Sequence, residues 1–368
     1  MNIFRAALVV ASVYTPLDAA AATLSTDTGP VTVTAAISGL NEPWAIAFLP
    51  DGGMLVTERD GRLLHFSSLG EVQAVRGLPR IDVNGQGGLL DVLVPRDFAD
   101  SREIFLTYAK RQGRGSGTTL AKALLSPDGS RLQDVRDIFE MARGTSGGRH
   151  FGSRVVEGDD GYLYVTIGDR GDRHSAQDIT VEAGSVVRIA RDGRVPADNP
   201  FRSTASARPS LYSIGHRNPQ GAALDADGNL WVVEHGARGG DEINFVEPGL
   251  NYGWPIISYG THYTGFSIGE GTAKEGLEQP SYYWDPSIAP SGMMIYQGDM
   301  FPEWRGDIFV GSLKFDMISR LDIDGKSAQE VERISGPETE RVRDIREAPD
   351  GSIWFLSVGN GAAYRISR

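Results

Sequence analysis

One pattern recurs six times along the chain: a turn rich in Asp and Gly, followed by a run of β-branched and aromatic residues. Asp and Gly tolerate the backbone angles of tight turns, and β-branched and aromatic side chains favour strands. The six copies are LPDGGMLVTE (49–58), FADSREIFLTYA (98–109), GDDGYLYVTIGD (158–169), DADGNLWVVEHG (225–236), WRGDIFVGSL (304–313) and APDGSIWFLSVG (348–359). A repeated strand unit is typical of propellers, so the sequence predicts an all-β fold, a six-bladed β-propeller.

The regions between the copies support this prediction. Neither amphipathic helical periodicity nor a regular alternation of strands and helices is found, which disfavours a parallel α/β fold. Copies spaced by roughly 45 to 80 residues leave room for long connecting loops. In a propeller such loops meet at one end of the central channel, so residues far apart in sequence can share a pocket.

Composition excludes several classes of function. With 368 residues, 40% of them hydrophobic, the chain can bury a substantial core. A formal net charge of -12 argues against a general nucleic-acid binder, which needs a basic face. The chain has no cysteine, which rules out disulfides, thiolate zinc sites and cysteine nucleophiles.

The N-terminal segment has the layout of a secretory signal peptide. Arg5 lies near the start, an apolar run follows from Ala7 to Tyr14, and small residues stand at 19–22. We therefore expect a signal peptide over residues 1–22, a propeller domain over 23–368, and a periplasmic or secreted protein. The alternative is a buried or frayed N-terminal segment. The apolar run is too short to span a bilayer, and no later segment is typical of a membrane span.

Two glycine-rich loops carry candidate catalytic side chains. NGQGGLLDV contains Gln86, and GGRHFGSR contains His150, which we expect at the start of the strand that ends in TIGDRGD, with Asp169 at its far end. Histidine suits proton abstraction near neutral pH, and a carboxylate can fix its tautomer. The alternatives are an ordinary surface hairpin for Gln86 and a structural, hydrogen-bonded role for His150.

Cationic and amide side chains follow in three further motifs. GHRNPQG supplies Arg217 and Asn218, which can bind a carboxylate or quinone oxygen, although Arg217 could instead clamp an acidic side chain of a neighbouring blade. SLKFD supplies Lys314, and ERVRD supplies Arg341 and Arg343 at strand spacing. If these three side chains face the channel, they form a binding site for an anion. If they face outward, they are ordinary surface charges.

The stretch EHGARGGDEINFVEPGLNYGWP offers oxygen ligands for calcium. Main-chain carbonyls of Gly236 and Ala237 are one candidate site, and Glu242 with the Tyr252 carbonyl is a second. The alternative for Asp241 and Glu242 is a solvated turn. DIDG at 322–325 is not an EF-hand loop, because Arg333 stands where its terminal Glu is needed.

Taken in order, these motifs resemble the soluble, pyrroloquinoline quinone (PQQ) dependent glucose and aldose sugar dehydrogenases. The resemblance runs from about Asn41 to the C-terminus, and GHRNPQG together with DEIN and NYGWP are its specific parts. It implies an oxidoreductase that oxidises the anomeric carbon of aldoses to lactones, with PQQ and calcium as cofactors. We also expect an electron acceptor, whose identity the sequence does not show, and a protein that is a monomer or dimer.

The resemblance assigns roles to individual residues. His150 would be the base, with Gln86 and Asp169 holding substrate and base. Arg217 and Asn218 would contact the quinone oxygens, with Arg217 stabilising the charge that develops there. Lys314, Arg341 and Arg343 would bind the carboxylates of PQQ. Calcium on the cofactor would rest on Gly236 and Ala237, and a second calcium on Glu242 and Tyr252.

One departure and two alternatives remain open. The family mostly has Pro where this chain has Ala237, which loosens the loop and predicts weaker calcium or cofactor binding. A calcium-dependent lactonase-like propeller hydrolase would need acidic side chains in the channel, and a non-catalytic extracellular binding propeller would need no such site.

Overall fold

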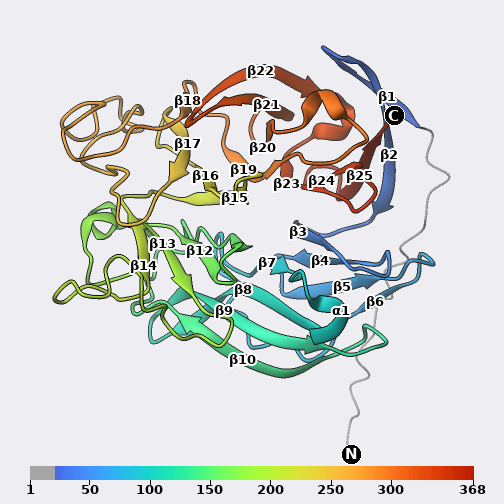
Figure 1. Cartoon of the computed structure of the whole chain (residues 1–368), viewed down its shortest axis with the longest axis horizontal. Helices are drawn as coiled ribbons and strands as arrows, with labels where there is room; N and C mark the ends of the chain where they lie inside the picture. The colour runs from blue at the N-terminus through green and yellow to red at the C-terminus, as the bar shows by residue number, and fades with distance from the viewer. Residues whose placement is uncertain (1–20) are drawn as a thin grey trace, which may run out of the picture.

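The computed structural model describes residues 21–368, which form six antiparallel sheets around a central axis (Figure 1). The predicted all-β, six-bladed propeller is confirmed. The predicted signal peptide lies outside the described residues except for its last two positions, and it stays a prediction. No helix in the described range 21–368 has the length and apolar character needed to cross a bilayer.

Five blades are built from consecutive strands, and the sixth joins the two ends of the chain. Blade 1 has β3 (Pro43–Phe48), β4 (Met54–Glu58), β5 (Arg62–Phe66) and β6 (Val72–Ala74); blade 2 has β7 (Leu89–Leu93), β8 (Glu103–Gln112), β9 (Gly115–Leu125) and β10 (Leu132–Glu140). Blade 3 has β11 (Val155–Glu157), β12 (Leu163–Ile167), β13 (Ser185–Ile189) and β14 (Leu211–Ile214); blade 4 has β15 (Pro219–Leu224), β16 (Leu230–Glu234), β17 (Asp241–Val246) and β18 (Tyr282–Trp284). Blade 5 has β19 (Pro290–Ile295), β20 (Ile308–Ser312), β21 (Met317–Asp324) and β22 (Ser327–Ser335); blade 6 has β23 (Val342–Glu347), β24 (Ile353–Ser357), β25 (Ala362–Ser367), β2 (Gly29–Ser38) and β1 (Ala22–Thr26).

The helices are short. They are α1 (Phe98–Ser101) and three 3₁₀ turns, η1 (Arg173–Gln177), η2 (Pro302–Trp304) and η3 (Pro337–Thr339). The helix α1 occupies the turn of the second repeat copy, which was expected to be a simple turn before a strand.

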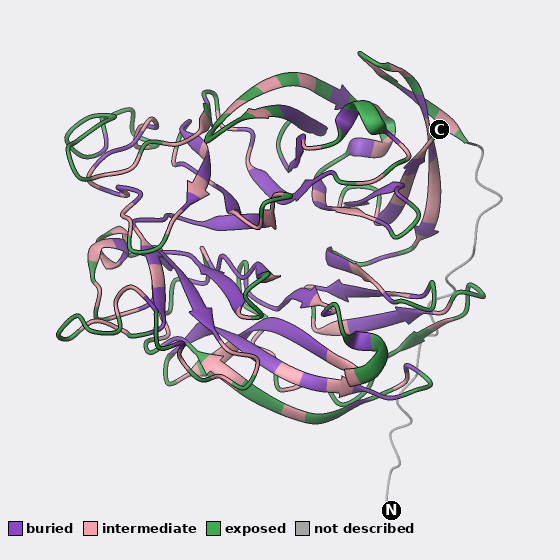
Figure 2. Ribbon diagram, in the orientation of Figure 1, coloured by how far each residue is buried: buried purple, intermediate pink, exposed green. Residues whose placement is uncertain are grey.

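Each repeat copy forms the second strand of its own blade. The six strands are β4, β8, β12, β16, β20 and β24. They are almost entirely buried, as the purple strands in Figure 2 show, because neighbouring blades cover both of their faces. Burial on both faces explains why these segments are continuously apolar rather than alternating.

A buried threonine at an equivalent place in three copies links one blade to the next. The hydroxyl of Thr57 donates to the Leu90 carbonyl at 2.6 Å, Thr107 to Ser153 at 2.7 Å, and Thr166 to the Pro219 carbonyl at 2.9 Å. Each bond satisfies a buried polar group while fixing the next blade. The blades therefore hold the loops at the channel mouth in a fixed register.

The axis itself carries a buried network of opposite charges. Arg154 pairs with Asp91 at 2.7 Å and with Asp344 at 3.1 Å, and Arg346 reaches Asp91 at 3.2 Å. These residues come from blades 2, 3 and 6. Removing one partner would leave another charge buried and unpaired, so the network favours a single arrangement of these blades.

Candidate active site

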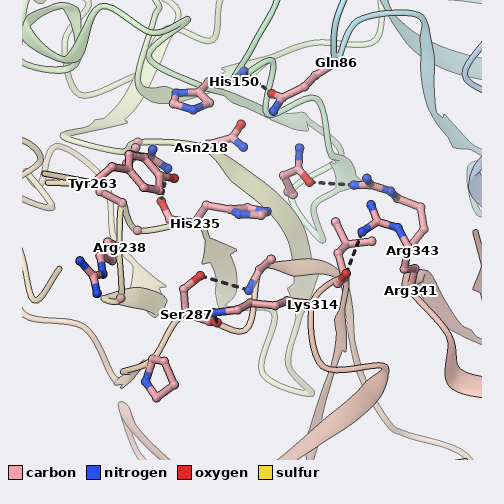
Figure 3. Close-up of a pocket in the computed structure, with 18 of the residues that line it drawn as sticks. Gln86, His150, Asn218, His235, Arg238, Tyr263, Ser287, Lys314, Arg341 and Arg343 are labelled. Atoms are coloured by element: carbon pink, nitrogen blue, oxygen red, sulfur yellow. Dashed lines mark hydrogen bonds between the residues drawn. The ribbon is translucent and has the colours of Figure 1, made fainter. Parts of the chain in front are cut away.

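A cavity of about 1000 Å³ opens among loops from several blades. Nine of the residues singled out from the sequence line it, and six of them are labelled in Figure 3. The nine are Gln86, His150, Arg217, Asn218, Gly236, Ala237, Lys314, Arg341 and Arg343. Their sequence separations span most of the chain, so the propeller brings them together as expected.

His150 is held by a carboxylate behind it. Its Nδ1 lies 2.6 Å from Asp169 Oδ1, while its backbone N–H donates to Gln86 Oε1 at 2.7 Å. Asp169 also accepts bonds from the Gly171 amide at 2.7 Å and from the Trp254 indole at 2.9 Å. An ionised, immobilised Asp169 places the proton on Nδ1, so the Nε2 lone pair of His150 is available to the pocket.

Burial sets the protonation of this pair. Desolvation is the main cause that lowers the pKa of His150 below its usual value, with the Arg217 charge acting in the same direction and Asp169 opposing both. Burial by itself would raise the pKa of Asp169, but the hydrogen bond and the charge of His150 outweigh this effect and lower the pKa of the carboxyl. His150 is therefore a neutral imidazole near pH 7, as a general base must be.

One detail of the expectation for His150 is wrong. His150 lies in the loop before β11, whereas Asp169 follows the next strand, β12. The two strands pair antiparallel, with Val155 opposite Val165, so the start of β11 and the end of β12 lie at the same edge of the blade. That pairing brings the two side chains into contact although they belong to different strands.

The two glycine-rich loops fit together by backbone contact. The Gln86 amide donates to the Gly148 carbonyl at 2.7 Å. Gly85 has φ +60°, and a Cβ at this position would lie 2.2 Å from the same carbonyl oxygen. Only glycine fits this conformation and approach. The loop holding Gln86 is thus part of the pocket wall and not an isolated surface hairpin.

Glu234, at the end of β16, positions the GHRNPQG loop. Its carboxylate accepts bonds from His216 Nδ1 at 2.8 Å, the Arg217 amide at 2.5 Å and Asn244 Nδ2 at 3.0 Å. The His216 ring also lies against Tyr252, with ring centres 4.8 Å apart. This histidine is structural, and its contacts fix the backbone from which Arg217 and Asn218 reach the pocket.

The four cations predicted as site residues face this cavity without a carboxylate partner. Within residues 21–368 none of Arg217, Lys314, Arg341 and Arg343 forms an ion pair with an acidic side chain. Their side chains donate hydrogen bonds to neutral oxygens: Arg217 to the His235 carbonyl, Lys314 to the Ser287 carbonyl, Arg341 to the Leu313 carbonyl and Arg343 to Gln220 Oε1. Arg217 therefore does not clamp an acidic side chain of another blade.

The cations repel one another across the pocket. Burial first, and then the charges of Arg341 and Arg154, lower the pKa of Arg343 to about 10. Glu42 and Asp285 are the acidic side chains that line the cavity, and Glu42 pairs with Arg59 at 2.6 Å. The local field is positive in a protein of net charge -12. A ligand with several carboxylates would relieve this repulsion.

Gly236 and Ala237 line the pocket on a loop braced by Asp241. Asp241 is buried in β17, where it accepts bonds from the Gly236 amide at 2.8 Å, the Ser287 hydroxyl at 2.7 Å and the Ala289 amide at 2.9 Å. The alternative that Asp241 and Glu242 form a solvated turn is wrong, because both residues belong to a central strand.

Glu242 and Tyr252 lie apart from the pocket lining. Burial and then the nearby Glu234 charge raise the pKa of Glu242 well above its usual value. The Tyr252 hydroxyl donates to the Phe245 carbonyl at 2.7 Å. Within residues 21–368 no group of three or more His, Asp or Glu side chains could hold a metal ion, and the second calcium site, built from one carboxylate and a main-chain carbonyl, stays a prediction.

Sequence reasoning missed several residues that line the cavity. They are Glu42, Trp44, Arg59, Gln220, His235, Arg238, Tyr259, Thr261, Tyr263, Asp285, Pro286, Ser287, Ala289 and Leu313, with Gly85 and Gly239. Most come from short stretches without a distinctive motif. His235 was open to inference, because it stands between two residues already considered, Glu234 and Gly236.

His235 differs from His150 in its surroundings. Burial, followed by the charges of Arg217 and Arg343, lowers the pKa of His235 to about 3, so its imidazole is neutral. Its Nε2 is buried and has no hydrogen-bond partner within the described residues. An unsatisfied acceptor at the wall of a cationic pocket suits a ligand that carries an N–H or O–H donor.

The sequence is similar to that of a known protein family and of one of its relatives. A family model described as "Glucose / Sorbosone dehydrogenase" matches residues 40–365. Aldose sugar dehydrogenase YliI of Escherichia coli (strain K12) is 42% identical over 335 residues, which cover 89% of this chain and 90% of that protein.

Solved structures of similar sequence have the same fold. The apo form of the soluble aldose sugar dehydrogenase from Escherichia coli superposes with a TM-score of 0.89 at 39% identity, covering 92% of this chain and 99% of that one. The PQQ-bound aldose sugar dehydrogenase from Streptomyces coelicolor has a TM-score of 0.75 at 25% identity, covering 92% and 98%.

Proposed function

Because this chain belongs to the glucose/sorbosone dehydrogenase family, we propose that it is a PQQ-dependent aldose sugar dehydrogenase that oxidises the anomeric carbon of aldoses to lactones. The observation that carries the proposal is the convergence of Arg217, Lys314, Arg341 and Arg343, none of which has a carboxylate partner, beside a carboxylate-bound neutral histidine. The relative solved with PQQ shares the fold and a quarter of the sequence.

The residues present fit PQQ. Lys314, Arg341 and Arg343 offer charge-assisted hydrogen bonds to its carboxylates, and Arg217 and Asn218 offer donors to its quinone oxygens. The unpartnered Nε2 of His235 provides an acceptor for a ring N–H. PQQ, when bound, supplies the acceptor for the hydride that the sugar loses.

His150 removes the proton in this proposal. Its Nε2 takes the proton of the anomeric hydroxyl as the hydrogen on the anomeric carbon leaves with its electron pair, and the carbon becomes a lactone carbonyl. Asp169 holds the ring and stabilises the imidazolium that forms. Arg217 places a fixed positive charge beside the site of developing negative charge, with no reorganisation needed during the reaction.

We also propose calcium as a second cofactor. Its supports are the sequence motif and the position of Gly236 and Ala237 in the pocket wall, where their loop is braced by Asp241. Alanine supplies the same carbonyl as proline, but with a less restricted backbone. Export to the periplasm or the exterior is proposed from the N-terminal pattern alone.

The test uses purified apoprotein with PQQ and calcium, glucose and a reducible dye. We expect dye reduction that requires PQQ. The His150→Gln variant should lose about 10²- to 10⁴-fold in kcat, because a general base is removed, while absorbance titration shows PQQ binding within a few-fold of the unaltered protein. Equal turnover by this variant would refute His150 as the base, and no turnover by the unaltered protein would refute the function.

The hydrolase alternative predicts a different result in the same assay. It needs acidic side chains in the channel, whereas six of the charged side chains that line the cavity are cations and two, Glu42 and Asp285, are acidic. A calcium-dependent lactonase would release acid from a lactone without PQQ. A binding propeller would neither reduce the dye nor hydrolyse the lactone.

A further inference from the structure

Two asparagines in the chain are followed directly by glycine. They are Asn84, in the connection between β6 and β7, and Asn360, in the turn between β24 and β25. Both asparagines are exposed, and the two glycines have similar φ angles, +60° for Gly85 and +58° for Gly361. Because glycine has no side chain, its backbone nitrogen can be reached by the side-chain amide of the residue before it. The contacts of each pair therefore decide which pair can react.

Hydrogen bonds hold the Asn360 pair on both sides of the bond that would form. Asn360 Nδ2 donates to the Pro337 carbonyl at 2.9 Å and to the Glu338 carbonyl at 3.3 Å. The Gly361 N–H donates to the Val358 carbonyl at 3.3 Å. The side-chain amide is thus kept in place, and the nitrogen that would attack it is already engaged.

The Asn84 pair has neither restraint. Within residues 21–368 the Asn84 side chain and the Gly85 N–H make no hydrogen bond. The loop is ordered through a different group, since the Asn84 carbonyl accepts a bond from the Gly87 amide at 2.9 Å. A free side-chain amide therefore stands next to a free backbone nitrogen on the protein surface.

The loop of Asn84 also contacts the candidate active site. The Gln86 amide donates to the Gly148 carbonyl at 2.7 Å, and Gln86 Oε1 accepts the His150 backbone N–H at 2.7 Å (Figure 3). A Cβ at Gly85 would lie 2.2 Å from the Gly148 carbonyl oxygen, so the two loops are already in the closest approach that glycine permits. A longer backbone at Gly85 would have to displace Gln86.

We propose that Asn84 is a site of spontaneous deamidation in the folded protein, and that the isoaspartate formed there lowers activity by displacing Gln86 from His150. Hydroxide removes the proton of the Gly85 amide, and the nitrogen attacks Cγ of Asn84. The Cγ–Nδ2 bond breaks, and ammonia leaves with a proton taken from water. Water then adds to one of the two carbonyls of the resulting succinimide and opens the ring to aspartate or isoaspartate.

Isoaspartate changes the main chain itself. The peptide then runs through the former side chain, which adds one carbon to the backbone between residues 84 and 85. The chemical step is independent of the proposed function, whereas the loss of sugar oxidation rests on it.

The first test measures isoaspartate at both sites during incubation in mildly alkaline buffer, by peptide mapping with mass spectrometry and enzymatic isoaspartate labelling. In the folded protein Asn84 should accumulate about tenfold more isoaspartate than Asn360 or better, because the Asn360 amide must first break two hydrogen bonds. In denaturant the two sites should react at similar rates, since folding no longer protects Asn360. Equal isoaspartate at the two sites of the folded protein would overturn the proposal.

The second test follows glucose oxidation by the PQQ- and calcium-loaded enzyme over the same incubation. Activity of the unaltered protein should fall in proportion to its isoaspartate content. Asn84→Gln should keep its initial activity, because the longer side chain would have to close a larger ring. Asn360→Gln is the matched control and should lose activity as the unaltered protein does.

The two readouts separate this inference from the proposed function. Isoaspartate at Asn84 in a protein that never oxidises sugar would overturn the function and keep the modification site. Full activity in protein whose Asn84 is converted to isoaspartate would overturn the link to Gln86.

Discussion

Two histidines with different partners stand at the wall of one pocket. His150 has a carboxylate behind it at 2.6 Å, so it can receive a proton and have the resulting charge stabilised. His235 has only cations as charged neighbours, and its pKa of about 3 prevents it from acting as a base. Environment therefore divides the imidazoles into a base and a hydrogen-bond acceptor.

The Asp169→Asn variant tests this division through its pH profile. Asp169 raises the pKa of His150 against the effect of burial, so its removal should lower that pKa further and move the acid limb of kcat/KM to lower pH. Activity at neutral pH should still fall by about 10²-fold or more, because the ring loses its fixed tautomer and orientation. A pH series measures both effects.

Asp172→Asn is the matched control, since Asp172 is an exposed acid three residues away in the same loop. The Asp172→Asn variant should leave the acid limb of the kcat/KM profile at the same pH as in the unaltered protein. An unmoved limb in Asp169→Asn would contradict the assigned pair.

At the level of elements, the strand β17 does more than complete a sheet. Asp241 braces the loops of Gly236 and Ser287, while Glu242 stands opposite Glu234 in the register of β16 and β17. Two carboxylates at neighbouring positions, partly desolvated, repel each other. A cation bound near Glu242 would convert this destabilising feature into a stabilising one.

Glu242→Gln should therefore raise the thermal midpoint of unfolding measured without calcium. It should also remove any increase in that midpoint that added calcium produces. The first effect comes from lost repulsion, and the second from a lost ligand. Calorimetry with chelator and then with calcium measures both. Glu247→Gln, at a half-buried acid that pairs with Lys326, is the control and should retain the calcium effect. A full calcium-dependent rise in Glu242→Gln would exclude Glu242 as a ligand.

At the scale of the whole molecule, the blades were predictable because each second strand has a local signature, and the family resemblance is confirmed by the match over residues 40–365. The contacts that define the site were less predictable. The His150–Asp169 contact depends on the pairing of β11 with β12, and Tyr263 depends on a hairpin formed with Arg238. Such contacts arise from three-dimensional packing between segments that carry no mutual sequence signal.

Closure of the ring also belongs to this scale. Blade 6 combines three C-terminal strands with β2 and β1, and Leu24, Val31 and Val33 pack into the same apolar cluster as Ile366. Deleting residues 1–28 removes β1 and should lower the thermal midpoint by about 5 °C, mainly through the lost burial of Leu24. Deleting residues 1–38 also removes β2 and should abolish cooperative unfolding. Cooperative unfolding at the original temperature in the longer deletion would contradict closure by β2.

The central claim is that the cations of separate blades form one site for a ligand with several carboxylates. Absorbance titration of the apoprotein with PQQ in the presence of calcium tests it directly. We predict saturable binding, with each of Lys314→Gln, Arg341→Gln and Arg343→Gln weakening Kd by about tenfold or more, the value of one charge-assisted hydrogen bond, and the exposed Lys274→Gln leaving Kd unchanged. PQQ binding of equal affinity in the triple variant and the unaltered protein would contradict the account.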